Sequence, residues 1–206
     1  LAKLSGKFKF WLWSGVMVGL AVMTKGVVGL TPFAVIGLYE LYLFFTKQQK
    51  LDFWLINRYI SFFVISLVVF MPWHIYMYNV YGMTFVNQYL GYHVLARATE
   101  AIEDKGQPWW WYFVVLRVSM RIWFVALIAS IPWFIYNLRS TNLKTDKKNG
   151  FVFMLIWASF VMFFFSIAKS KLVWYIIPIY PALAIVLGIF GERVLNYLMQ
   201  KYSKLN

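Results

Sequence analysis

Six continuous apolar blocks constrain this chain more than any other feature of its sequence. They lie at 8–24, 27–45, 59–78, 110–137, 151–168 and 173–191. Most approach or exceed the ~20 apolar residues with which an α-helix crosses the hydrocarbon core of a bilayer. Lipid offers no hydrogen-bond partner to an exposed backbone, so each block is expected to be helical. The sequence therefore predicts an all-α, polytopic transmembrane helix bundle, with about six helices in a single transmembrane domain over residues 1–206.

The composition excludes several classes of function. The chain is 62% hydrophobic and has a mean hydropathy of +0.66, which is too apolar for an ordinary soluble domain. It has no cysteine, which excludes disulfides, thiolate metal sites and cysteine nucleophiles. Its net charge of +13 lies mostly in short loops between apolar blocks, so we expect membrane lipid and no nucleic acid as a partner.

The distribution of Lys and Arg predicts the orientation of the chain. With the N-terminus inside, the segments 1–10, 46–58, 138–150 and 192–206 are cytoplasmic and hold 13 of the 20 basic residues, whereas the outer segments hold 5. Positive charge marks the cytoplasmic side of membrane proteins. This bias fits six crossings with both ends in the cytoplasm.

The outer segment 79–109 differs from the other loops in its length and its aromatic content. It ends at Trp109 and is followed by Trp110, Trp111 and Tyr112, and these side chains favour the headgroup level of a bilayer. We therefore expect 79–109 to form an outer loop with interfacial helices. Arg117 and Arg121 follow in the fourth block, where they would be costly in lipid. Either they pair with the acids at 100–104, or this block begins as an interfacial helix and enters the membrane later.

Several basic side chains fall on the outer side, where lysine is normally scarce. Cations in or near lipid tend to pair or to mark a substrate path, and a convergent group suits a phosphate. The candidates are Lys25, Arg97, Lys169 and Lys171, with Tyr175 one turn beyond the last. Two alternatives stay open: Lys25 could snorkel from a helix end, and Lys169 and Lys171 could be ordinary loop charges.

The two histidines carry weaker signals. His93 and Arg97 would share a face at i, i+4 if their segment is α-helical, although a structural, hydrogen-bonded role for His93 is the alternative. His74 is expected to be an interfacial anchor. Two histidines without an H-x-x-x-H pattern cannot complete a zinc site. Gly15 and Gly19, four residues apart, are typical of close packing between membrane helices.

Five motifs occur in an order that resembles a known family. They are G-L-A-V-M-T-K-G (19–26), M-P-W-H (71–74), Y-H-V-L-A-R (92–97), Q-P-W-W-W-Y (107–112) and A-K-S-K-L-V-W-Y-I-I-P-I-Y-P-A (168–182). Together they resemble the GT-C membrane glycosyltransferases of the protein O-mannosyltransferase and aminoarabinose transferase group. The last motif is the most specific, and its Pro178 and Pro181 predict a kink at the start of the last block.

The resemblance implies an activity and a site. Such enzymes move a sugar from a polyprenyl phosphate carrier to a lipid, protein or glycan acceptor on the outer side, here of a bacterial inner membrane. The resemblance places Lys25, Arg97, Lys169 and Lys171 around the carrier phosphate. It also implies that His93 helps to bind a zinc ion. The family's catalytic carboxylate belongs to a first outer loop that matches no residue of this chain, so we expect a fragment that lacks the N-terminal part and is inactive alone.

Two other classes of function remain as alternatives. A transporter or flippase for an anionic lipid or lipid-linked sugar would also use intramembrane cations and helices broken by proline. A structural membrane subunit would use its charges only to set topology. The cations of this chain gather at one face rather than at mid-depth, which favours an enzyme acting at the outer leaflet.

Overall fold

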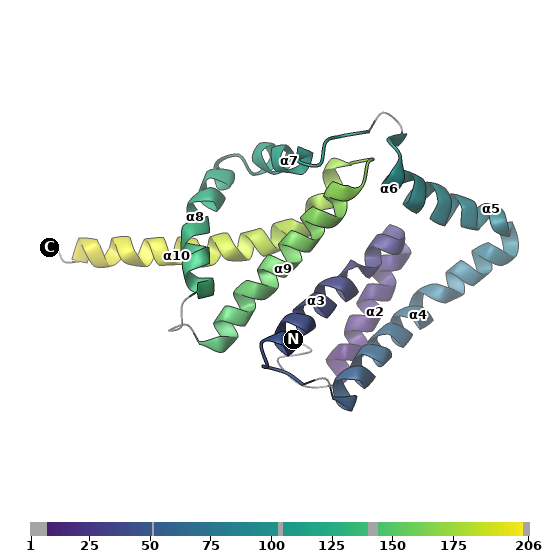
Figure 1. Ribbon diagram of the computed structural model, residues 1–206, viewed down its shortest axis with the longest axis horizontal. Coiled ribbons are helices and arrows are strands. Elements are labelled where there is room, and N and C mark those ends of the chain that lie inside the picture. The colour runs from purple at the N-terminus through teal and green to yellow at the C-terminus, as the bar shows by residue number, and fades with distance from the viewer. Residues whose placement is uncertain (1–7, 51, 103–104, 140–143, 204–206) are drawn as a thin grey trace. The chain divides into compact units, whose positions relative to one another are not determined.

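The computed structural model describes residues 8–50, 52–102, 105–139 and 144–203. Contacts within the chain divide it into two compact units, Leu1–Arg97 and Ala98–Asn206, and each unit is considered by itself (Figure 1). Five helical runs in the described residues are long and apolar enough to cross a membrane: Lys9–Phe45, Phe53–Tyr81, Ile122–Arg139, Thr145–Ile167 and Val173–Ser203. The prediction of an all-α, polytopic membrane protein is confirmed.

The first unit is built on a helical hairpin, which explains why six predicted blocks appear as five runs. The helix α2 (Phe8–Lys25) continues into the 3₁₀ helix η1 (Gly26–Leu30) and then α3 (Thr31–Phe45) without a loop. A Cβ on Gly29 of η1 would lie 2.4 Å from the backbone of Ala21, so η1 folds back onto α2. Phe33 of α3 then packs against the core formed by Trp11, Val18 and Phe62.

The helix α4 (Phe53–Tyr81) packs tightly along α2. A Cβ on Gly15 would lie 2.8 Å from the carbonyl oxygen of Phe62, and one on Gly19 would lie 2.5 Å from Cβ of Val69. The buried Ser66 hydroxyl donates to the carbonyl of Gly15 over 3.0 Å, which joins the two helices where lipid could not supply a partner. The predicted close packing at Gly15 and Gly19 is confirmed.

The outer segment turns away from α4 at Gly82, which has a φ of 54° (Figure 1). It continues as α5 (Met83–Val86), a π-helix η2 (Asn87–Ala96) and α6 (Arg97–Thr99). The expected helices in the segment 79–109 are therefore present in its first part, whereas the described residues from 105 to 109 are not helical. The position of the helices α5, η2 and α6 at the membrane surface stays a prediction.

The second unit contains α7 (Trp111–Met120), α8 (Ile122–Arg139), α9 (Thr145–Ile167), the 3₁₀ helix η4 (Val173–Ile179) and α10 (Tyr180–Ser203). The fourth predicted block breaks between α7 and α8 at Arg121, which has a φ of 50°. At 10 residues α7 is too short to cross a bilayer. This break fits the alternative in which the block begins as an interfacial helix. Of the acids at 100–104, Glu103 and Asp104 lie outside the described residues.

The two prolines near 180 act differently from the kink that we expected. Pro178 lies inside η4, and Pro181 is the second residue of α10. A proline is tolerated in the first turn of an α-helix because the amide it removes has no intrahelical acceptor there. The prolines therefore delay the start of α10 rather than bend it.

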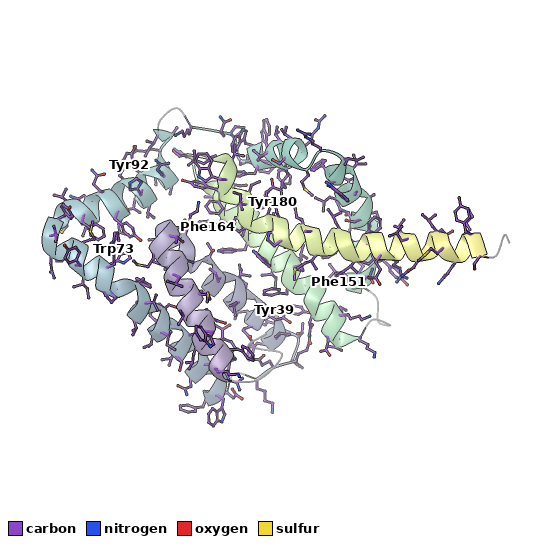
Figure 2. The ribbon with its side chains drawn as sticks, turned by 180° about the vertical axis from the view of Figure 1, so that it is seen from behind. Tyr39, Trp73, Tyr92, Phe151, Phe164 and Tyr180 are labelled. Carbon is purple, nitrogen blue, oxygen red and sulfur yellow. The ribbon has the colours of Figure 1, made fainter. Side chains whose placement is uncertain are left out.

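Many large apolar side chains lie exposed on the helices (Figure 2). Trp13 of α2, Val68 of α4 and Val125 of α8 all expose more than 60% of their surface. A water-soluble protein seldom exposes apolar patches of this extent, but a membrane protein places them against lipid.

Candidate functional site

Lys25 stands at the turn of the first unit's hairpin. It is the last residue of α2, its side chain is exposed, and Gly26 follows with a φ of 64°. This left-handed backbone favours glycine, which explains the Lys25-Gly26 pair of the motif. A Cβ on Gly26 would also lie 3.2 Å from Oη of Tyr89, so the turn touches the outer helical segment.

An apolar pocket of about 210 Å³ lies beside this turn. Its lining comes from α2, η1, α4 and the outer segment: Val22, Val27, Leu30, Phe70, His74, Phe85, Val86, Tyr89 and Leu90. Lys25 lies in sequence between Val22 and Val27, two residues of this lining. The turn that bears the exposed Lys25 therefore also supplies part of the pocket lining.

His74 and Tyr89 form the polar element of the pocket. Nδ1 of His74 lies 2.8 Å from the carbonyl oxygen of Phe70, and Nε2 lies 2.9 Å from Oη of Tyr89. The carbonyl can only accept, so Nδ1 carries a proton, and in the neutral ring Nε2 accepts from the Tyr89 hydroxyl. Burial raises the pKa of Tyr89, which keeps that hydroxyl protonated. His74 is thus part of a pocket wall, a role that its sequence neighbours did not indicate.

Arg97 contacts Tyr92, which lies five residues earlier in the chain. The guanidinium carbon of Arg97 lies 5.7 Å from the centroid of the Tyr92 ring, within the range of a cation–π interaction. The expected i, i+4 relationship of His93 and Arg97 assumed an α-helix, whereas Asn87–Ala96 is a π-helix, whose backbone hydrogen bonds join residues five apart. A shared face for His93 and Arg97 stays a prediction. The side chain of His93 is exposed.

The described residues by themselves contain no complete site for the zinc ion that the resemblance implies. Among them, no group of three His, Asp or Glu side chains could hold a metal ion. The metal role of His93 therefore stays a prediction.

Lys171 is buried at the junction between α9 and η4. Only 4% of its surface is exposed, and Nζ donates hydrogen bonds to the carbonyls of Gln107, over 3.0 Å, and of Ala168. Burial lowers the pKa of Lys171. Its ammonium is held by backbone carbonyls, so it joins two segments of the second unit. Phosphate binding by Lys171 stays a prediction, because these two carbonyls take two of the three N–H donors of the ammonium.

Ser170 completes this connection. Its hydroxyl donates to the carbonyl of Glu100 over 2.7 Å and accepts from the amide of Ile102 over 2.8 Å. The amide of Lys171 donates to the carbonyl of Lys105 over 2.9 Å. We call the residues 169–172 with these partners in 98–107 the junction latch. The latch fixes a non-helical segment whose backbone groups would otherwise lack partners.

Lys169 and Tyr175 lie on either side of the buried latch residues. The side chain of Lys169 is exposed, although its amide donates to the carbonyl of Ala98 over 3.1 Å. The ring of Tyr175 packs against Phe165 of α9, with 5.0 Å between the centroids. Of the predicted phosphate ligands in the second unit, Lys169 is therefore the cation that is accessible.

The helical architecture is that of an integral membrane protein, and its match to a solved structure shows part of the GT-C membrane fold. A solved structure, that of ArnT from Cupriavidus metallidurans bound to undecaprenyl phosphate, matches with a TM-score of 0.65 and 24% sequence identity. The match covers 93% of this chain and 34% of that chain.

Curated relatives agree with this fold and confirm the resemblance that the motifs predicted. The chain is 26% identical over 201 residues to the undecaprenyl phosphate-alpha-4-amino-4-deoxy-L-arabinose arabinosyl transferase of Serratia proteamaculans. This alignment covers 98% of the chain and 34% of the relative. A transferase of the same name from Sodalis glossinidius is 24% identical over 95% of the chain. An uncharacterized protein of Aquifex aeolicus is 29% identical over 89%. No family model matches the chain. The chain spans about a third of the length of these relatives.

Proposed function

We propose that the full-length protein containing this chain is a membrane glycosyltransferase that uses a sugar linked to a polyprenyl phosphate. The observation that carries this proposal is the similarity, along 98% of the chain, to a transferase named for an undecaprenyl phosphate sugar donor. By the same similarity, the proposed sugar is an aminopentose. The reaction would occur at the outer face of a bacterial inner membrane, with a lipid, protein or glycan as acceptor.

The first unit would contribute to holding the carrier. The pocket of about 210 Å³ offers an apolar lining to isoprene units, and the exposed Lys25 offers a charge to the phosphate. Arg97 is a second candidate cation, which Tyr92 orients by stacking. Transfer of the sugar leaves negative charge on the departing phosphate, and a fixed cation in a site of low dielectric stabilises that charge most in the transition state.

The second unit would contribute Lys169 as a phosphate ligand and Lys171 as a positioning residue. The side chain of Lys169 is exposed, whereas the ammonium of Lys171 donates hydrogen bonds to backbone carbonyls at the junction latch. The latch fixes the backbone from which Lys169 projects. This division of roles explains why the motif contains two lysines separated by a buried serine.

A transporter or flippase was the alternative from sequence. Those relatives above whose names state a function are transferases, and this favours an enzyme over a transporter. The two activities also differ in their products. A transferase releases free polyprenyl phosphate as the sugar moves to its acceptor, whereas a flippase moves the intact donor across the bilayer.

The test uses membranes that contain the full-length protein and a polyprenyl phosphate carrying a radiolabelled aminopentose. We expect label in an acceptor and an equal amount of free polyprenyl phosphate, separated by thin-layer chromatography. Lys25→Met and Lys169→Met should each lower the rate, while Lys144→Met, on the side predicted to be cytoplasmic, should not. Intact donor appearing in the opposite leaflet without release of the sugar would overturn the proposal.

A further inference from the structure

The second unit has a half-open cavity that lies far in sequence from its junction latch. It has a volume of about 490 Å³ and lies among the end of α8, the first turns of α9 and the second half of α10. Side chains with polar groups from all three helices contribute to its lining, among them Trp133, Asn137, Lys147, Glu192, Arg193 and Tyr197. The proposed sugar transfer uses none of them.

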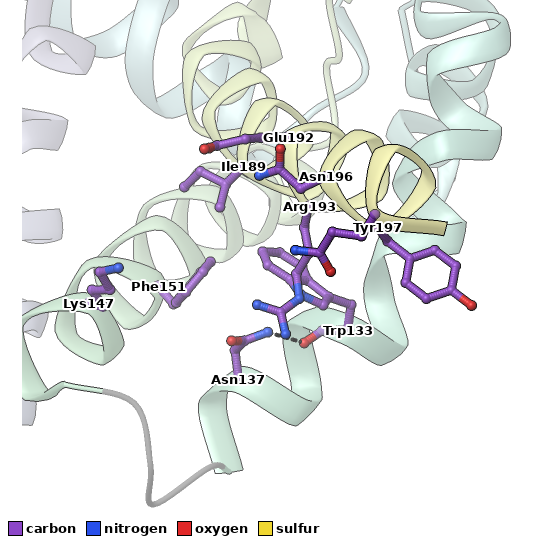
Figure 3. Close-up of a pocket in the computed structure, with 10 residues that line it drawn as sticks. Trp133, Asn137, Lys147, Phe151, Ile189, Glu192, Arg193, Asn196 and Tyr197 are labelled. Carbon is purple, nitrogen blue, oxygen red and sulfur yellow. Dashed lines mark hydrogen bonds between the residues drawn. The ribbon is translucent and has the colours of Figure 1, made fainter. Parts of the chain in front are cut away.

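Two cations of this cavity are available to an anion. Arg193 reaches from α10 toward Trp133 and Asn137 of α8, and Lys147 projects from α9 on another side (Figure 3). Within the described part of the chain, the side chains of Lys147 and Arg193 form no ion pair or hydrogen bond. A guanidinium presents two parallel N–H groups to a phosphate, and an ammonium adds a point charge. The cavity therefore has the donors that a phosphate group requires.

The location of the cavity indicates the source of that phosphate. Its lining belongs to the ends of helices that border 138–150 and 192–206, two segments that the charge distribution predicts to be cytoplasmic. Trp133 and Tyr197 are aromatic residues of the kind that favour the headgroup level. Basic pockets between helices on the cytoplasmic side are suited to lipid headgroups.

We propose that this cavity binds the phosphate of a phospholipid headgroup in the cytoplasmic leaflet. Arg193 and Lys147 contact the phosphate oxygens. Glu192, which also lines the cavity, accepts from the ammonium of a zwitterionic headgroup, so the site takes phosphatidylethanolamine as well as phosphatidylglycerol. This lipid site is separate from the proposed sugar transfer and does not depend on it.

The test measures lipid binding to the full-length protein in detergent by native mass spectrometry. The probes are phosphatidylglycerol, phosphatidylethanolamine, diacylglycerol and inorganic phosphate. The variant Lys147→Gln/Arg193→Gln removes the two cations of the cavity. The matched control Arg139→Gln/Lys201→Gln removes two exposed cations from the same helical ends that do not line the cavity.

We expect the cavity variant to bind both phospholipids about 25-fold more weakly, about fivefold for each charge, and the control to change by less than about twofold. Glu192→Gln should weaken phosphatidylethanolamine more than phosphatidylglycerol. Diacylglycerol, which has no phosphate, should not bind to the site. Tight binding of inorganic phosphate that the cavity variant loses would identify free phosphate as the ligand and overturn the lipid assignment. Equal weakening in the two double variants, or none in either, would overturn the site itself.

Discussion

The ammonium of Lys171 donates a hydrogen bond of 3.0 Å to the backbone carbonyl of Gln107, a residue 64 positions earlier in the chain. A lysine in this position would ordinarily be read as a loop charge or a ligand. Here its long side chain spans from the α9–η4 junction to the segment that precedes α7. The same charge that could bind a phosphate is used to hold two pieces of backbone together.

Lys171→Met should therefore act first on stability. The variant leaves the carbonyls of Gln107 and Ala168 without their donor, and loss of a buried, charged hydrogen-bond donor costs about 1–3 kcal/mol. We expect a lower melting temperature of the full-length protein in detergent, measured by differential scanning fluorimetry. Lys169→Met is the control, because it removes the same charge from an exposed neighbour and should leave the melting temperature unchanged. A stable Lys171→Met variant with reduced donor affinity would instead make Lys171 a ligand.

Ser170→Ala should open the segment that the junction latch holds. The Ser170 hydroxyl is the acceptor for the amide of Ile102, over 2.8 Å. Without it, we expect the Ile102 amide to exchange with deuterium about tenfold faster, a change equivalent to one net hydrogen bond of ~1.4 kcal/mol. Hydrogen exchange read by mass spectrometry measures this directly. Ser119→Ala is the matched control, because Ser119 bonds only to Val115 within α7. Unchanged protection at Ile102 would contradict the latch.

Gly29→Ala should disrupt the hairpin of the first unit. Its new Cβ would lie 2.4 Å from backbone atoms of Ala21 and Val22, which cannot move as a flexible side chain would. Overpacking of this kind costs about 1–3 kcal/mol or more. Gly37→Ala in α3 is the control, because no atom lies within 4 Å of its new Cβ and alanine favours a helix. The yield of folded monomer in size-exclusion chromatography should fall for Gly29→Ala only. Equal yields would show that η1 does not pack on α2 as described.

The helices could be predicted from sequence because lipid imposes one requirement on every crossing segment. A long apolar block leaves the backbone no alternative to a helix, so the runs Phe53–Tyr81 and Thr145–Ile167 follow from composition. Gly15 and Gly19 likewise have a local explanation, since small residues four apart let helices approach. The sequence does not predict the break at Arg121, because a non-glycine residue with positive φ has no reliable sequence signal.

The details of the candidate site depended on contacts that sequence spacing does not encode. The contact of Arg97 with Tyr92 was not foreseen, because Asn87–Ala96 is a π-helix and nothing in its sequence distinguishes it from an α-helix. The ammonium of the buried Lys171 donates to the carbonyl of Gln107, 64 residues away in the chain. The partner of His74 in α4 is Tyr89 of the outer segment, and a turn at Gly82 is needed to bring them together.

Tyr89→Phe tests whether the pocket beside Lys25 holds the carrier. The change removes the hydroxyl that donates a hydrogen bond of 2.9 Å to Nε2 of His74, but it keeps the aromatic ring that lines the pocket. The loss of one hydrogen bond should cost about 1 kcal/mol of stability. Because the ring orientation of His74 is then less restricted, we expect the KM for the polyprenyl phosphosugar to rise about fivefold with little change in kcat, since the pocket contacts the carrier and not the sugar.

Leu90→Gln in the same pocket wall makes this test sharper. A polar amide in the apolar lining should weaken binding of a long polyprenyl carrier more than that of a short-chain analogue, because only the long chain fills the pocket. Leu95→Gln is the control, because Leu95 lies exposed in the same outer segment and does not line the pocket. Steady-state kinetics with donors of two chain lengths measure the difference. If Leu90→Gln and Leu95→Gln reduce the preference for the long chain equally, the carrier binds elsewhere.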